Sequence, residues 1–227
     1  MMRRHFEEQI AECNSRLVHM GTVAALMIEK SIRCLLDRNA EGHGEIFRHE
    51  DDVNRLHIEI DDRVILALAL QHPVAADLRL LLMASKIAGE LERIGDQAVN
   101  ICQNTAAVLQ HPPSESSSSM RSMSGAVREM LKQSLEAFVD RNVEMAQAVL
   151  DADDKVDAFK DQVFFELLGN MMSEPATAPR AVALILISRS LERVADHATN
   201  IAEEVIYAAL GRDVRHHHLE TAGSEES

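Results

Sequence analysis

The 227-residue sequence is poor in the residues that build several common classes of protein. Its three cysteines, Cys13, Cys34 and Cys102, are widely spaced and form no CxxC pair, which argues against a disulfide framework or a thiolate zinc site. We expect them to be buried, reduced thiols. Aromatic residues make up only 3% of the chain and Trp is absent. Because β-sandwiches and barrels rely on aromatic and β-branched side chains, this composition favours packed helices.

Basic clusters and long apolar runs are also missing. No run of Lys or Arg exceeds two residues and the net charge is −14, which argues against nucleic acid or an anionic membrane surface as the partner. The longest apolar runs, 64–70 and 181–187, have seven residues each and are too short to span a membrane. No apolar signal region follows the first basic residues. We therefore expect a cytoplasmic protein that does not insert into a membrane.

One eleven-residue stretch occurs in two copies, at 91–101 and 191–201. Seven of the eleven positions are identical at a spacing of 100, which indicates an internal duplication. At helical spacing the apolar residues of each copy, such as Leu91, fall on one arc, while Glu92 and Asp96 fall on the opposite arc. The stretch is therefore predicted to be a helix whose acidic stripe points away from the core.

Helix breakers divide each copy into three helices. Asp140–Asn142 reproduces Asp37–Asn39 at a spacing of 103, so the duplication extends over all three. The expected helices are 5–38, 45–72 and 75–109 in the first copy, and 122–150, 152–172 and 176–210 in the second. The predicted fold is all-α, with two tandem three-helix bundles at 1–110 and 122–211, a Pro/Ser-rich linker at 111–121 and a C-terminal tail at 212–227, whose last residues we expect to be mobile.

Pairs of oxygen-bearing side chains four residues apart are the candidate site. The pairs are Glu50 with Asn54, Glu92 with Asp96, Asp153 with Asp157, and Glu192 with Asp196. Residues four apart lie on one helix face, where two carboxylates repel each other and a cation removes the repulsion. If the second and third helices of a bundle are adjacent, two pairs converge as ligands for Mg²⁺, Mn²⁺, Ca²⁺, Zn²⁺ or iron. The alternative is a solvated acidic face.

His197 follows one of these carboxylates and either adds a nitrogen ligand or lies just outside the coordination sphere. Arg93 is expected to be solvated or to pair with a neighbouring acid such as Glu90. The sequence has no Gly-rich phosphate loop, Ser/His/Asp arrangement or reactive-cysteine context, so nothing in it requires an enzyme. The outward-facing stripe also argues against a di-iron bundle, whose ligands point into the core.

The two LER[IV]xD helices, the Glu/Asp-x-x-x-Asp pairs and the segment 200–207 resemble the PhoU family, over residues 5–220. The resemblance implies two bundles related by a pseudo-twofold axis, metal-binding surface carboxylates and frequent homodimers. It also implies a negative regulator of phosphate uptake and of the phosphate-starvation response, acting between the phosphate transporter's ATPase and a sensor histidine kinase. The family's metal motif falls on the eight residues of the four pairs, with Asn54 departing from the acidic pattern.

Two other functions are alternatives to this interpretation of the sequence. A metal-dependent enzyme acting on phosphate compounds would employ these carboxylates but would need an open coordination position in a pocket. A purely structural adaptor in transporter assembly would need no metal.

Overall fold

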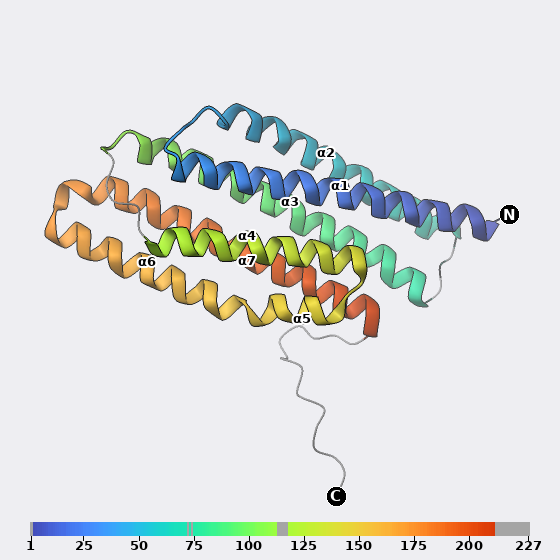
Figure 1. The fold of residues 1–227 in the computed structure, drawn as a ribbon. Coiled ribbons are helices and arrows are strands. Elements are labelled where there is room, and N and C mark those ends of the chain that lie inside the picture. The colour runs from blue at the N-terminus through green and yellow to red at the C-terminus, as the bar shows by residue number, and fades with distance from the viewer. Residues whose placement is uncertain (1, 72, 74, 113–117, 212–227) are drawn as a thin grey trace, which may run out of the picture.

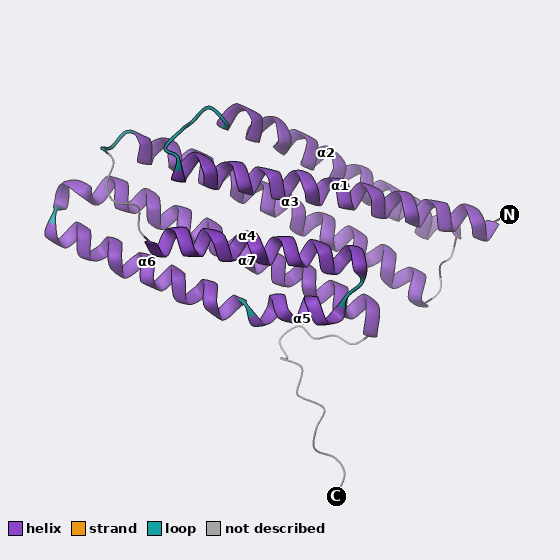
Figure 2. Cartoon of the chain, viewed as in Figure 1, coloured by secondary structure: helices purple, strands orange, loops and turns teal. Residues whose placement is uncertain are grey.

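Seven α-helices and one 3₁₀-helix form the part of the chain that the structure, a computed structural model, describes: residues 2–71, 73, 75–112 and 118–211. Figure 2 shows helices and loops in these ranges and no strand. The elements are α1 (Met2–Leu36), α2 (His43–Gln71), α3 (Ala75–Leu109), α4 (Ser118–Asp140), α5 (Val143–Asp151), α6 (Asp153–Ser173), η1 (Pro175–Thr177) and α7 (Ala178–Leu210). The predicted all-α class is confirmed.

The long helices run along one common axis, with α3 and α7 packed against each other in the middle (Figure 1). The first copy places α1 and α2 on α3, and the second places α4, α5 and α6 on α7. A further contact between α1 and α4 joins the two copies. None of the described helices combines the length and apolar character needed to cross a membrane.

A single hydrophobic core runs through both copies of the repeat. Leu91 and Ile94 of α3 and Leu191 and Val194 of α7 are completely buried. The apolar arc that the sequence predicts is therefore the arc that enters the core. The two bundles share this core, which explains why the third helix of each copy carries the strongest internal similarity.

The three cysteines are buried and free, as the sequence predicts. Burial raises the pKa of the Cys13 thiol to about 11 and that of Cys102 to about 12, in each case because the thiolate would lose its hydration. These residues therefore act as small apolar side chains in the core.

The expected helix at 122–150 is wrong, because the first helix of the second copy ends at Asp140. Arg141 adopts the left-handed conformation with φ of 51°, which breaks the helix. The next residue, Asn142, caps α5 by accepting a hydrogen bond from the N–H of Met145 at 3.0 Å. In the first copy Arg38 has the same φ of 51° just after α1, so the two copies turn in the same way.

The middle helix of the second copy is divided into α5 and α6 at Ala152, whereas α2 is continuous in the first copy. Helix α4 begins at Ser118, so the final residues of the expected 111–121 linker are helical. The 212–227 tail, including the residues expected to be mobile, lies outside the described residues.

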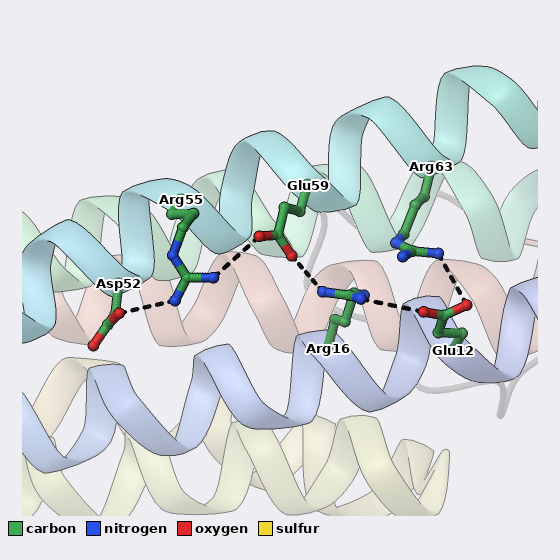
Figure 3. Close-up of polar contacts among 6 residues, drawn as sticks. All are labelled: Glu12, Arg16, Asp52, Arg55, Glu59 and Arg63. Carbon is green, nitrogen blue, oxygen red and sulfur yellow. Dashed lines mark hydrogen bonds and ion pairs between the residues drawn. The ribbon is translucent and has the colours of Figure 1, made fainter.

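An ion-pair ladder joins α1 to α2 (Figure 3). Arg16 of α1 bridges Glu12 and, across the helix interface, Glu59 of α2. Glu59 also accepts a bond from Arg55 at 3.0 Å, and Arg63 donates to Glu12 at 2.9 Å. The members are half-buried to exposed, so each pair contributes at most about 1 kcal/mol, and the ladder chiefly fixes how α1 and α2 lie against each other.

Candidate metal centres

The repeated acidic stripe lies along the edges of the two central helices. Because Leu91 and Ile94 of α3 enter the core, Glu92 and Asp96 fall at the boundary between core and solvent and are half-buried. On α7, Glu192 is half-buried in the same way. The stripe therefore lies at the edge of the core, on the side of each central helix that is turned away from the core.

The second copy brings all four of its predicted ligands together. Asp153 and Asp157 stand on α6, and Glu192 and Asp196 stand on α7, which packs against α6. Desolvation, followed by the charges of the other three and of Asp154, raises the pKa of Asp153 to about 6. Desolvation and Glu192 likewise raise the pKa of Asp196. These four residues, the second acidic cluster, are thus close enough to oppose one another's ionisation.

Lys160 lies within the second acidic cluster, and sequence reasoning missed it. Its ammonium group donates to Asp157 at 2.7 Å and to Glu192 at 3.0 Å, which ties α6 to α7. Hydrogen bonds to these two carboxylates raise the pKa of Lys160. The signal was present in the sequence, because Lys160 follows Asp157 by three residues and so lies on the same helix face. The cluster therefore contains its own counter-ion.

The first copy assembles a less charged counterpart from α2 and α3. Desolvation raises the pKa of Glu50, and the charges of Asp96, Asp51 and Glu92 raise it further. Asn54 brings no charge. Glu50, Asn54, Glu92 and Asp96, the first acidic cluster, thus include three carboxylates whose electrostatic coupling supports the predicted convergence of α2 and α3.

His197 is hydrogen-bonded to Glu90 and is therefore not placed as a simple metal ligand. Its Nδ1 lies 2.7 Å from Oε2 of Glu90, on α3 of the other copy, and Asn200 donates to the same oxygen at 3.0 Å. Arg93 contacts the other oxygen of Glu90 at 3.3 Å, which is one of the two arrangements expected for this side chain. Together these bonds lower the pKa of Glu90 although its burial acts in the opposite direction. Glu90 is a link between the two copies that the sequence did not reveal.

The chemistry of both clusters fits a hard cation, because carboxylate oxygens from two helices converge and repel one another. Within the described ranges, however, no group of three or more His, Cys, Asp or Glu side chains is arranged to hold an ion. In the second acidic cluster the ammonium of Lys160 stands between Asp157 and Glu192. A cation entering there would have to displace it, and binding by the eight residues remains a prediction.

Fold and site together define an all-helical protein built from two copies of one domain, each with a carboxylate cluster between its second and third helices. Comparison with known families gives the domain a name: a PhoU domain matches twice, at residues 17–105 and 120–205. The chain belongs to the PhoU family.

Relatives match over nearly the whole length. A protein of Clostridium acetobutylicum named phosphate-specific transport system accessory protein PhoU homolog is 32% identical over 216 residues, covering 94% of this chain and 98% of the relative. A Pseudomonas aeruginosa protein of the same name is 31% identical over 214 residues, covering 94% and 88%.

Solved structures agree with the fold. The crystal structure of PhoU from Pseudomonas aeruginosa has a TM-score of 0.88 at 30% identity, covering 91% of this chain and all of that one. The phosphate transport system regulatory protein PhoU from Streptococcus pneumoniae has a TM-score of 0.84 at 23% identity, covering 92% of this chain and 99% of the other, and supports the fold alone.

Proposed function

We propose that this protein is an accessory protein of a phosphate-specific transport system and a negative regulator of phosphate uptake and of the phosphate-starvation response. It acts in the cytoplasm as a metal-binding adaptor between the transporter's ATPase and a sensor histidine kinase. The observation that carries the proposal is the match of both domains, over nearly the full length, to relatives named as accessory proteins of that transport system.

Exposed apolar side chains on the C-terminal halves of α2 and α6, called here the two apolar ends, support an adaptor role. On the C-terminal half of α2, Ile58 and Ile65 are each 64% exposed, and on that of α6 Phe165 is 67% and Met172 is 79% exposed. Figure 1 shows that α2 and α6 end at opposite ends of the molecule. Apolar surface of this kind is typical of protein contacts. The surface on α2 is aliphatic, whereas that on α6 combines an aromatic ring with Met172, which suits two different partners.

The acidic clusters supply the metal-dependent part of the proposal. A bound cation would neutralise the carboxylates of α6 and α7 and release Lys160 from Asp157 and Glu192, changing the charge of the surface offered to a partner. Desolvation first, and then the neighbouring carboxylates, raise the pKa of Asp153, and a bound cation would lower this cost of charging Asp153. A homodimer formed through one apolar end also belongs to the proposal.

Affinity capture from phosphate-replete and phosphate-starved cells tests the function. The full-length protein should retain a sensor histidine kinase and a transporter ATPase, identified by mass spectrometry, and should retain more of them from replete cells. Ile65→Asp and Phe165→Asp each place a charge in one apolar end, so each variant should lose one partner and keep the other. Recovery of neither partner from wild-type protein under both conditions would contradict the proposal.

The role of the metal is tested in the same assay with Glu192→Ala/Asp196→Ala, which should weaken capture. Its matched control is Glu129→Ala/Glu136→Ala, which removes two exposed carboxylates from α4 and should leave capture unchanged. If Glu192→Ala/Asp196→Ala captured both partners as well as wild type does, the protein would be an adaptor that needs no metal.

A further inference from the structure

A cavity of about 300 Å³ lies between α3, α4 and α7, and neither acidic cluster contributes to its lining. Met83 of α3, Phe138 of α4 and Val205 of α7 form its floor, because these three lining side chains are almost completely buried. Ala209 and Arg141 are exposed and form part of its rim. The cavity is therefore an apolar hollow that opens to solvent.

The charge at this cavity is positive, although the chain as a whole carries a net charge of −14. Arg141 is the one charged residue among the described residues that line it. Its neighbour Asp140 lines a separate groove between α1 and α4, together with Glu136. The guanidinium of Arg141 makes no hydrogen bond or ion pair with the part of the chain that the structure describes. It is therefore available to an anionic group at the rim of the cavity.

The volume of the cavity sets the size of the molecule that it can hold. An apolar cavity of about 150 Å³ in another protein stays dry and binds benzene, a molecule of six carbon atoms. A cavity of about 300 Å³ therefore holds roughly eight to twelve carbon atoms. Ligand pockets begin at this volume, and they combine a mostly apolar lining with a few polar groups that orient the ligand.

We propose that this cavity binds a small amphipathic monocarboxylate, an unbranched fatty acid of about eight to ten carbon atoms. The chain of the acid lies on Met83, Phe138 and Val205. Its carboxylate accepts hydrogen bonds from Arg141 at the rim, because a guanidinium group matches a carboxylate with two parallel N–H donors. The ligand touches α3 of the first copy and α4 and α7 of the second, so it adds a link between the copies. Binding here does not depend on the partners proposed above.

NMR of the methionine ε-methyl groups in the full-length protein tests the location of the site, with sodium octanoate as the probe. Met83 lines the cavity, whereas Met27 is buried in the core and does not line it. Below its critical micelle concentration, octanoate should shift the Met83 resonance in a saturable manner and leave that of Met27 unchanged. The two resonances are assigned with Met83→Leu and Met27→Leu. No shift at Met83, or equal shifts at both methyl groups, would overturn the proposal.

Filling the cavity tests whether the chain of the acid lies inside it. Ala208→Leu adds three carbon atoms at a lining position and should raise the Kd for octanoate at least about tenfold, because each methylene group excluded from an apolar site costs about fourfold in affinity. The matched control, Ala158→Leu, makes the same change at an exposed position of α6 and should leave the Kd unchanged. Circular dichroism checks that both variants stay helical. Wild-type affinity in a folded Ala208→Leu would overturn the proposal.

Arg141→Gln tests the position of the carboxylate. It should raise the Kd for octanoate about fivefold, the effect expected of an exposed ion pair, and leave the Kd for 1-octanol unchanged. The matched control, Arg121→Gln, replaces another exposed arginine of α4 and should leave both values unchanged. Equal affinity of wild type for octanoate and 1-octanol would overturn the assignment of a carboxylate ligand, and so would an Arg141→Gln variant that binds octanoate as wild type does.

Discussion

Replacement of Lys160 by Met tests how much this side chain stabilises the second acidic cluster. The side chain pairs with Asp157 and Glu192, and Lys160 and Glu192 are each a little over a quarter exposed, while Asp157 is about half exposed. Ion pairs exposed to this degree contribute about 0.2–1 kcal/mol each. Lys160→Met should therefore lower the free energy of unfolding of the metal-free protein by about 1 kcal/mol, which is a fall of roughly 2–4 °C in Tm for a chain of this size.

The same substitution should strengthen metal binding. In wild-type protein a cation must first displace Lys160 from Asp157 and Glu192, and the variant removes that cost. A difference of about 1 kcal/mol corresponds to a roughly fivefold lower Kd, measurable by titration calorimetry with Mn²⁺.

Lys155→Met is the matched control, because this lysine lies on the same helix with its ammonium over the ring of Phe159. The control should change the affinity for Mn²⁺ much less than Lys160→Met does. An unchanged or weaker affinity in Lys160→Met would refute the argument that the lysine occupies the place of a cation.

Four further predictions concern the fold. Asn142→Ala removes the cap of α5 and should lower the free energy of unfolding by about 1 kcal/mol in denaturant titrations; an unchanged midpoint would contradict the capping role. A double-mutant cycle between Arg16 and Glu59 should give a coupling of about 0.5–1 kcal/mol that falls in 0.5 M salt, and a coupling insensitive to salt would contradict a partly solvated ion pair. Because the pKa values of Cys13 and Cys102 are raised, the folded protein keeps protons that the unfolded chain releases above about pH 9, so stability should decline above that pH. Both thiols should also react with a disulfide reagent at pH 8 only on unfolding, and rapid reaction in the native state would contradict their burial.

The duplication accounts for most of what the sequence could reveal. Leu91 and Leu191 sit at matching positions of a period that is clearly helical, so their burial and the outward placement of Glu92 and Glu192 were predictable. The break at Arg141 could also have been predicted, because the same three residue types, Asp-Arg-Asn, directly follow α1. The apolar periodicity alone, however, continues through it. The spacing of apolar residues does not depend on the φ of one arginine, so it gives no sign of a positive φ there.

The cross-copy contacts could not be predicted in the same way. Glu90 pairs with His197 and Asn200 because α3 packs against α7, and nothing in one helix specifies which residues of another will face it. Lys160 is an intermediate case: its place on the face of Asp157 follows from spacing, whereas its bond to Glu192 depends on how α6 and α7 approach each other.

Metal stoichiometry tests the central claim most directly. The full-length protein, wild type and Glu192→Ala/Asp196→Ala, would be dialysed to equilibrium against Mn²⁺ and the bound metal counted by mass spectrometry, with helical content followed by circular dichroism. The account predicts that the variant stays helical and loses the metal of the second acidic cluster, while Glu129→Ala/Glu136→Ala binds as wild type does. Wild-type stoichiometry in Glu192→Ala/Asp196→Ala would contradict the assignment of the carboxylates as a metal centre.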